Sequence, residues 1–291
     1  MKYFESVKEY LEFRKTVTDK KIGLVPTMGN LHEGHISLAQ RSMEDNDFTV
    51  VTIFVNPKQF GPNEDFARYP RTMQKDGDDL KALEMRVHKK DSTKEIILLA
   101  PQSINEIYPE GFSTSVKVNG LTDKLCGLNR PTHFEGVTTV VYRLFKIAQA
   151  DRAYFGQKDY QQFKVIDRMV KDLEIPVEMH MCPIVRDQDG LALSSRNQYL
   201  TPPEREKALV LPRTLKALSF LIERNPWSQA LEKVTKVRAE ALRDSKWQYL
   251  QFLDADTLEE INDNTRTILI AGAYQARGAR LIDNILVERN A

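Results

Sequence analysis

Four short apolar runs constrain the fold of this 291-residue chain more than any other feature of its sequence. They are "KIGLVPTMG", "FTVVTIFVNP", "TKEIILLAP" and "DRAYFG". A continuous apolar run, in contrast to a strictly alternating one, indicates a strand that is covered on both faces, as in a parallel sheet. We therefore expect each run to form a buried strand.

Segments with helical spacing separate these runs. The clearest is "HFEGVTTVVYRLFKIAQA", in which apolar residues recur every three or four positions from Val137 to Ala148. This alternation of strands and helices predicts a doubly wound (Rossmann-like) α/β domain with a parallel sheet. We expect helices within 3–20, 33–46, 64–85, 133–150 and 157–173, and a charged, solvated connection at 86–94.

The character of the sequence changes near residue 184. A "DQDG" turn signal is followed by Thr201, a good helix N-cap, with prolines in the first helical turn. Helical patterns at 201–225 and 227–243 then precede three apolar stretches at 247–261, 266–275 and 279–288. We predict two domains, 1–184 and 185–291, of which the second is a smaller α+β domain.

The composition excludes several classes of protein. Hydrophobic residues make up 41% and charged residues 29%, the balance of a soluble globular protein. A net charge of +1 gives no support to nucleic-acid binding, which usually needs a basic face. No apolar run approaches the roughly 20 residues that span a bilayer, and the start, "MKYFESVKEYLEF", does not resemble a signal peptide. Cys126 and Cys182 are far apart, so we expect two free thiols and a cytoplasmic protein.

Polar residues and glycines cluster directly after three of the expected strands. The stretches are "PTMGNLHEGH", "NPKQFGPNEDF" and "GQKDYQQ". Ligands of doubly wound sheets bind outside the carboxyl ends of the strands. We therefore expect the chemistry of the protein in these three stretches.

The first stretch places His32 and His35 three residues apart at the start of an expected helix. Catalytic zinc helices use H-E-x-x-H, with histidines at i and i+4, so the shorter spacing with Gly34 inside argues against zinc. Two interpretations stay open. The histidines are hydrogen-bonded helix caps, or they donate to a phosphate group at the helix N-terminus, which Gly29 and Gly34 would allow to approach closely.

Two further stretches favour the phosphate interpretation. "LSSRN", from Leu193 to Asn197, offers two hydroxyl groups and a guanidinium, which form charge-assisted hydrogen bonds with phosphate oxygens. "GQKDYQQ" adds Lys158 and Asp159 directly after a strand. Each stretch alone also fits a solvated polar loop or a surface Lys–Asp pair of little energy.

These motifs together resemble a known family. "PTMGNLHEGHISL" resembles the HIGH signature of nucleotidyltransferases, which is specific only to that superfamily. Six further motifs, in their order along the chain, resemble the pantothenate synthetase (pantoate–β-alanine ligase) family over nearly the whole chain. They are "FVNPKQF", "NEDFARYPR", "RPTHFEGVTTVV", "FGQKDYQQ", "DGLALSSRN" and "RLIDNI". The resemblance implies an ATP-dependent ligase that converts pantoate to pantoyl adenylate, releasing pyrophosphate. The amine of β-alanine then displaces AMP to give pantothenate.

The resemblance also implies a nucleotide site and its catalytic residues. His35 would be the proton donor, His32 would assist at the phosphates, and Lys158 would contact the transferred phosphate. Ser194, Ser195 and Arg196 would form a mobile loop that grips the phosphates from the second domain. The residues implied in ATP binding are Met28, Gly29, Asn30, Leu31, His32, Glu33, Gly34, His35, Gly156, Gln157, Lys158, Asp159, Val185, Leu193, Ser194, Ser195 and Arg196.

For the remaining ligands the resemblance implies three further residues. Gln59 and Gln162 would hydrogen-bond the pantoate hydroxyl and carboxylate groups, a task that suits an amide because it both donates and accepts. Asp76 corresponds to a position linked to Mg²⁺, an ion that would neutralise phosphate charge. The family also implies a homodimer that acts on the small molecules pantoate and β-alanine. The charge and the apolar pattern described above give no support to a nucleic-acid or membrane partner.

Two other functions stay open from the sequence. The HIGH signature also fits another nucleotidyltransferase of cofactor biosynthesis, one that leaves the nucleotide on its product. Gln59 and Gln162 suit a small polyol acid better than a phosphate acceptor, which argues against that alternative. The other is a non-enzymatic nucleotide or metal sensor. Nothing in the sequence favours it, and only zinc bound through His32 and His35 would support it.

Overall fold

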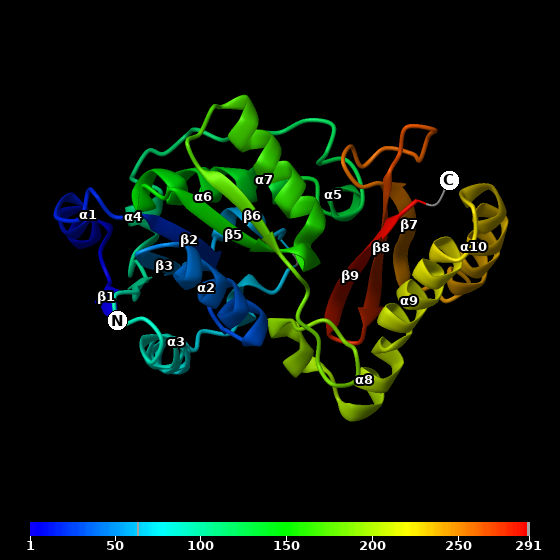
Figure 1. Ribbon diagram of the computed structural model, residues 1–291, viewed down its shortest axis with the longest axis horizontal. Helices are drawn as coiled ribbons and strands as arrows, with labels where there is room; N and C mark the ends of the chain where they lie inside the picture. Colours follow the sequence, from blue (N-terminus) through cyan, green and yellow to red (C-terminus); the bar gives the residue numbers. More distant parts are fainter. Residues whose placement is uncertain (63, 290–291) are drawn as a thin grey trace. The chain divides into compact units, whose positions relative to one another are not determined.

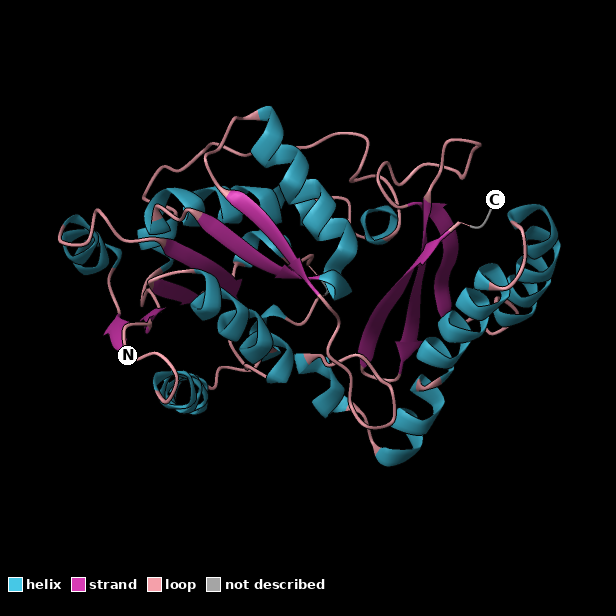
Figure 2. Ribbon diagram, in the orientation of Figure 1, coloured by secondary structure: helices cyan, strands magenta, loops and turns pink. Residues whose placement is uncertain are grey.

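A computed structural model describes residues 1–62 and 64–289 (Figures 1 and 2). Asn63 of the "NEDFARYPR" motif therefore lies outside the described residues. The chain forms two compact units. The first comprises Met1–Gly156 and Gln161–Pro183, and the second comprises Gln157–Tyr160 and the described residues from Ile184 onward. Because the short segment 157–160 belongs to the second unit, the chain passes from one unit to the other three times.

The first unit is built on a six-stranded sheet in which every pair of neighbouring strands is parallel. The order is β1-β4-β3-β2-β5-β6, so the chain extends from β2 to one side through β3 and β4 and to the other side through β5 and β6. The direction switches between β2 and β5, the place where such sheets bind ligands. The strands are β1 (Lys2–Phe4), β2 (Ile22–Thr27), β3 (Phe48–Ile53), β4 (Glu95–Leu99), β5 (Arg152–Gly156) and β6 (Glu178–Cys182).

Helices cover both faces of this sheet. Figure 1 shows α6 (His133–Ala148) and α7 (Tyr160–Asp172) on one side, and α2 (Glu33–Asp45) and α3 (Met73–His88) on the other. α1 (Val7–Lys15) packs against α6 and β1. The short helices α4 (Ile104–Ile107) and α5 (Cys126–Asn129) lie in the connection between β4 and α6. The doubly wound fold predicted from the apolar runs is confirmed.

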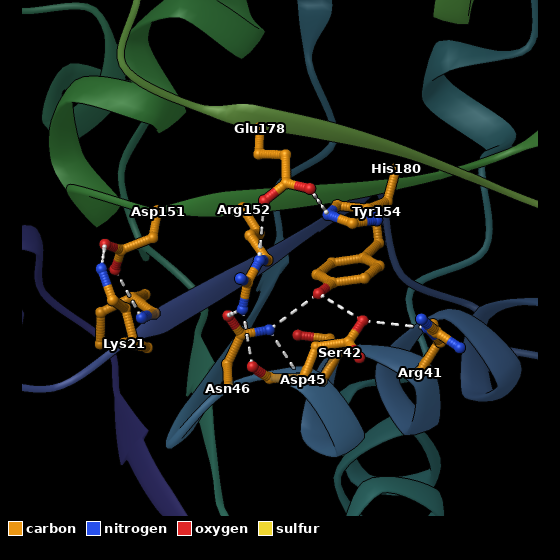
Figure 3. A network of polar contacts seen from close by, with 11 residues as sticks. Lys21, Arg41, Ser42, Asp45, Asn46, Asp151, Arg152, Tyr154, Glu178 and His180 are labelled. Atoms are coloured by element: carbon orange, nitrogen blue, oxygen red, sulfur yellow. Dashed lines mark hydrogen bonds and ion pairs between the residues drawn. The ribbon is translucent and has the colours of Figure 1, made fainter.

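A polar network ties the last turn of α2 to β5 and β6 (Figure 3). The Tyr154 hydroxyl donates to the Asp45 carboxylate at 3.0 Å and accepts from Asn46 Nδ2 at 2.9 Å. Arg152 donates to the Asp45 carbonyl oxygen at 2.8 Å and pairs with Glu178 at 3.0 Å. Burial, and secondarily the Asp45 carboxylate, raises the pKa of Tyr154, so its hydroxyl stays protonated. The network fixes one end of α2, and the other end carries the histidine pair.

The second unit combines helices with a three-stranded antiparallel sheet, which confirms the predicted α+β class. The sheet order is β7-β8-β9, so β9 is an edge strand. Its core joins the sheet to α9 through fully buried side chains such as Leu215, Leu218 and Ile270. The elements are α8 (Pro202–Ala208), α9 (Val210–Glu223), α10 (Trp227–Ala241), β7 (Trp247–Asp254), β8 (Thr267–Ala276) and β9 (Ala279–Glu288).

Two expected helices have different boundaries in the structure. Residues 3 and 4 were expected at the start of a helix, but they belong to β1 because their main chain pairs with β4. The helix expected at 201–225 is two helices that meet at Leu209. Pro212 has no N–H to donate to the carbonyl group four residues earlier, so it is tolerated only in the first turn of a new helix.

Two further differences lie outside the four apolar runs. α3 continues to His88, so the charged stretch expected as a connection is partly helical. β6 is an additional edge strand, and its sequence "EMHMC" carries polar residues because one side of it has no neighbouring strand. Within the described part of the chain, no helix is both long and apolar enough to cross a bilayer.

Candidate functional site

The turn that joins β2 to α2 has a backbone conformation that its sequence explains. Gly29 has a φ of +82° and Asn30 a φ of +51°, in the left-handed region that these two residue types tolerate best. A Cβ atom on Gly29 would lie 3.0 Å from Ile53 Cγ2 and 3.1 Å from Asp76 Oδ2. The chain can therefore turn sharply at the carboxyl end of β2 and enter α2 at once.

Asp76, in the first turn of α3, holds this turn in place. Its side chain is fully buried. Its carboxylate accepts hydrogen bonds from the backbone N–H groups of Asn30 and Leu31, each at 2.8 Å, and from the Thr72 hydroxyl at 3.0 Å. A buried carboxylate needs such partners, because an unpaired buried charge is very costly. Asp76 thus connects α3 to the segment that precedes the histidines.

His32 and His35 lie at the N-terminus of α2 with their ring centroids 4.1 Å apart. His32 Nδ1 accepts from the Gly34 backbone N–H at 3.1 Å, and His35 Nδ1 accepts from the His32 backbone N–H at 3.4 Å. A nitrogen that accepts carries no proton, so each neutral ring carries its proton on Nε2. The cap role uses Nδ1 and therefore does not exclude a donor role for Nε2 at the positive end of the helix dipole.

Gln59 lies in η1 (Pro57–Gln59), a short 3-10 helix after β3. Its side chain accepts from Asn56 Nδ2 at 3.0 Å and donates to Met28 Sδ at 3.2 Å. Asn56 is 1% exposed, donates to the Gly136 carbonyl oxygen at 3.1 Å, and accepts from the Tyr108 hydroxyl at 2.8 Å. The structure thus brings Gln59 and Met28, two residues named by the sequence, into contact.

The main chain of Gln59 is held by the "RPTHF" segment. Its carbonyl oxygen accepts from Arg130 at 3.2 Å and lies 2.9 Å from His133 Nδ1. Arg130 also donates two hydrogen bonds of 2.6 Å to Glu64. Burial opposes ionisation of Glu64, but the Arg130 guanidinium outweighs it and holds the pKa of that carboxyl below its usual range. The ion pair therefore persists at neutral pH and keeps Arg130 against Gln59.

A cavity of about 260 Å³ opens at the carboxyl ends of β2, β3 and β4 within the first unit. Met28 and Gly29 of the turn form part of its wall, together with Phe54, Arg71 and Asp76. The wall is partly apolar, and the Arg71 guanidinium in it is a group that can bind a small organic anion. Gln162 lies elsewhere along the same edge of the sheet, in the first turn of α7 that follows β5.

In the second unit, Lys158 lies in η3 (Gln157–Asp159). Asn284 of β9 donates from Nδ2 to the carbonyl oxygens of Gln157 and Lys158, at 2.9 and 3.0 Å. The Lys158 ammonium lies 3.9 Å from the Asp159 carboxylate, and its side chain is 21% exposed. Gly156, which the resemblance groups with these residues, is the last residue of β5 in the first unit.

Val185 and Leu193 lie opposite each other in a small hairpin. The Leu193 N–H donates to the Val185 carbonyl oxygen at 3.0 Å, and the neighbouring residues Arg186 and Ala192 form an antiparallel bridge. The "DQDG" segment makes the turn, with Gly190 at a φ of +92°. The turn predicted from this segment is therefore present, and it places the "SSRN" residues directly after the hairpin.

Ser194 is the N-cap of η4 (Ser195–Tyr199), and its hydroxyl oxygen accepts from the Arg196 backbone N–H at 3.3 Å. Ser194 and Lys158 both line a cavity of about 10 Å³ in the second unit, together with Asp283. Two segments that are more than thirty residues apart in the sequence thus lie side by side within this unit.

The described residues do not fit a metal ion held by the protein. Among residues 1–62 and 64–289, no three His, Cys, Asp or Glu side chains are arranged to hold one. The Asp76 carboxylate, named from the sequence for Mg²⁺, already accepts three hydrogen bonds in a fully buried position. The histidine pair likewise has no third ligand within that part of the chain.

Comparison with known proteins gives the family. The family model described as pantoate-beta-alanine ligase matches residues 2–286. This chain belongs to that family. The sequence resemblance to it is confirmed.

Relatives named pantothenate synthetase are similar over nearly the whole chain. The protein of Acetivibrio thermocellus is 48% identical over 268 residues, which is 92% of both chains. That of Thermotoga petrophila is 45% identical over 295 residues, covering 99% of this chain and all of its own.

Solved structures of such ligases share the fold. Pantothenate synthetase from Thermus thermophilus has a TM-score of 0.85 and 43% identity, covering 98% of this chain and 99% of its own. Pantoate-beta-alanine ligase from Francisella tularensis, complexed with beta-gamma ATP and beta-alanine, has a TM-score of 0.76 and 33% identity, covering 98% of this chain and 97% of its own.

Several residues of the candidate site were not named from the sequence. Asn56, Arg130 and His133 hold Gln59, and they belong to motifs that were quoted without roles being given to them. Gln161 is 5% exposed, accepts from the Cys126 N–H at 2.9 Å and donates to two carbonyl groups of the segment before α5. Only the three-dimensional contacts separate these positioning residues from other polar residues of the motifs.

Proposed function

We propose that this chain joins pantoate to β-alanine at the expense of ATP, and forms pantothenate, AMP and pyrophosphate. The pantoate carboxylate attacks the α-phosphorus of ATP, and pyrophosphate leaves. The β-alanine amine then attacks the carbonyl carbon of pantoyl adenylate, loses a proton and displaces AMP. Membership of the ligase family supports this reaction. The structural observation that carries it is the histidine pair at the N-terminus of α2, in which each Nδ1 accepts a backbone N–H and so leaves Nε2 as the donor of a neutral ring.

The first step brings two anions together, so the site must neutralise negative charge. The N-terminus of α2 supplies backbone N–H groups and the positive end of a helix dipole. We assign His35 and His32 as donors to the phosphate oxygens, and Met28 to His35 as the wall of the ATP site. Losing one preorganised donor of this kind typically costs about 10²–10³ in rate.

Pantoate, in this proposal, is bound by the amides of Gln59 and Gln162. The Gln59 side chain is fixed by Asn56 and Met28, and its main chain by Arg130 and His133. A rigid amide of this kind both donates and accepts, which suits a molecule that carries hydroxyl groups and a carboxylate. The nearby 260 Å³ cavity offers room for a small organic acid beside Met28.

We further propose that the second unit contributes to the same reaction. It carries four side chains of the types that bind phosphate oxygens, namely Lys158, Ser194, Ser195 and Arg196. Lys158 and Ser194 line one cavity within that unit. Gly156, Gln157, Asp159, Val185 and Leu193 would complete the nucleotide site through their backbone groups. The first unit would then be the nucleotide- and pantoate-binding domain, and the second a lid.

Magnesium is proposed to enter with ATP as its phosphate-bound ion rather than through Asp76. When bound, it would neutralise phosphate charge. The Asp76 carboxylate is committed to Asn30, Leu31 and Thr72, which supports a positioning role for it.

A homodimer in the cytoplasm is the proposed assembly and location. The family resemblance supports the dimer, and two free cysteines support a reducing compartment. Light scattering of the purified protein measures its molar mass and so its oligomeric state. A molar mass equal to that of one chain would contradict the homodimer.

The test of the proposed function is product formation with omission controls. Purified protein is incubated with ATP, Mg²⁺, pantoate and β-alanine, and pantothenate and AMP are measured. Equal amounts of both are expected, and neither is expected when any one substrate is left out. A product that still carries the nucleotide would instead support the other nucleotidyltransferase class.

A further inference from the structure

We propose that Asp283 and Asn284, consecutive residues of β9, are positioning residues that set Lys158 and the "SSRN" segment against each other. This inference rests on the proposed function, because that is where Lys158 and Ser194 are assigned to the nucleotide phosphates. It goes beyond that function in assigning a role to "RLIDNI", a motif far from both segments in the sequence.

The position of the two residues on β9 lets them act in two directions. Consecutive side chains of a strand point to opposite faces of the sheet. Asp283 pairs with Gly272 and Asn284 with Ala271 of β8, so both lie well within the strand. β9 is the edge strand of its sheet, so segments outside the sheet can pack beside it. Both residues are only 3% exposed.

Asn284 fixes the backbone around Lys158. Its Nδ2 donates to the carbonyl oxygens of Gln157 and Lys158, and its Oδ1 accepts from Gln157 Nε2 at 3.2 Å. Both of its amide protons and its carbonyl oxygen are thus used on one segment of three residues. No isosteric apolar residue can replace this set of bonds, and aspartate would place a negative charge against two carbonyl oxygens.

Asp283 fixes the hairpin that precedes Ser194. Its carboxylate accepts two hydrogen bonds from Arg186, at 2.6 and 2.9 Å. Arg186 also donates to the Gly190 carbonyl oxygen at 3.1 Å, so it connects the first arm of the hairpin and its turn to β9. Such a two-point Arg–carboxylate pair fixes orientation as well as distance.

The two fixed segments meet at one place. Lys158, Ser194 and Asp283 line the same cavity of about 10 Å³, roughly the space of one water molecule. Two adjacent strand residues therefore determine the spacing of an ammonium group and a hydroxyl group proposed to bind one triphosphate. A misplacement of about 1 Å in such a group can cost about 100-fold in rate.

The main alternative is that these residues only stabilise the second unit. A matched control exists in the same sheet. The Tyr274 hydroxyl, on β8, donates to Asp244 at 2.8 Å, and Tyr274 is likewise 3% exposed. Tyr274→Phe removes a hydrogen bond of this sheet without touching residues 157–158 or the hairpin.

The experiment measures pantoate-dependent exchange of pyrophosphate into ATP, together with the midpoint of thermal unfolding, in the full chain. Asn284→Ala is expected to lower the maximal exchange rate about 10- to 100-fold, while Tyr274→Phe stays within about twofold of the unaltered protein at a comparable unfolding midpoint. The KM for β-alanine in the complete reaction is expected to be unchanged. Asp283→Asn provides a second variant if Asn284→Ala does not fold.

A double-mutant cycle with Lys158→Ala makes the test specific. If Asn284 acts through Lys158, Asn284→Ala is expected to cost less than about threefold in the Lys158→Ala background. The proposal is overturned if Asn284→Ala lowers the exchange rate by the same factor in the Lys158→Ala background as in the unaltered protein. It is also overturned if Asn284→Ala and Tyr274→Phe lower the exchange rate equally. If Lys158→Ala exchanges normally, the assignment of Lys158 to the nucleotide is wrong and the proposal falls with it. Absence of exchange in the unaltered protein identifies a failure of the adenylate step of the proposed function, which is distinct from a failure of this inference.

Discussion

The His32 and His35 rings lie 4.1 Å apart, and each uses Nδ1 to accept a backbone N–H of the same helix terminus. Backbone N–H groups of the helix terminus thereby help to orient both imidazoles. The arrangement makes capping and proton donation separable functions of one ring, because they use different nitrogens.

The two functions of His35 can be separated by substitution. His35→Ala should lower turnover about 100-fold or more by removing one transition-state donor. Asn can imitate the accepting Nδ1 position, and Gln can place an N–H near the Nε2 position. We therefore expect His35→Gln to be more active than His35→Asn in steady-state assays, although His35→Asn keeps the cap. Near-normal turnover of His35→Asn would reduce His35 to a cap residue.

Asp76→Asn should act on the turn and not on the metal. The amide has one acceptor oxygen where the carboxylate has two, so at least one backbone N–H of the turn loses a charged partner in a buried position. A loss of about 1.5–3 kcal/mol is expected in urea unfolding. In exchange assays the half-saturating Mg²⁺ concentration should change less than about twofold. A large rise in that concentration at unchanged stability would restore Asp76 as a metal ligand.

Arg196→Ala should slow adenylation more than it weakens pantoate binding. A guanidinium proposed to bind the phosphates stabilises charge that develops when pyrophosphate leaves. Single-turnover formation of pantoyl adenylate is expected to fall about 10²-fold or more, with the pantoate dissociation constant within about threefold. Lost pantoate affinity at an unchanged adenylation rate would reassign this side chain.

Gly136→Ala tests the packing of α6 against η1. A Cβ at residue 136 would lie 2.2 Å from the Lys58 carbonyl oxygen, so the helix and η1 must separate. We expect a destabilisation of about 1–3 kcal/mol from overpacking, and a higher KM for pantoate because Gln59 ends η1. Gly61→Ala is the control, since a Cβ there meets only Glu64 atoms at ordinary van der Waals distances. A normal KM in Gly136→Ala would separate this contact from pantoate binding.

The second unit should lose stability at high pH through Tyr274. Burial, then the hydrogen bond to Asp244, raises the pKa of Tyr274 to about 12, against an ordinary value of 10.0. The unfolded chain therefore releases this proton first, so the stability contribution is complete below about pH 10 and declines as the pH rises toward 12. Urea unfolding of Tyr274→Phe should show a shallower decline between pH 10 and 12. An identical decline in both proteins would assign the loss to other groups.

The fold could be predicted because the buried residues of each central strand are consecutive in the sequence. Val25, Val51 and Leu98 are buried strand residues whose neighbours along the chain are also apolar, so the pattern itself reports burial on two faces. β1 and β6 could not be predicted in this way. β1 has three residues and depends on pairing with β4, and β6 is an edge strand with a mixed sequence.

From the sequence, the site could be predicted only as a set of polar residue types at certain positions in the motifs, without their contacts. His32, Gln59, Lys158 and Ser194 stand in polar stretches that follow strands or turns, which made them candidates. The task of Asp76 could not be seen, because its partners are backbone N–H groups 45 and 46 residues earlier in the sequence. Asn284 was also missed, because its link to Lys158 spans 126 residues and exists only after β9 has formed.

The most direct measurement of the central claim is exchange of labelled pyrophosphate into ATP in the absence of β-alanine. In the proposed reaction, an acyl adenylate forms reversibly before the amine is needed. Exchange is therefore expected with pantoate and Mg²⁺ present, and no exchange when pantoate is omitted. Folded protein that makes pantothenate but shows no pantoate-dependent exchange would contradict the adenylate route.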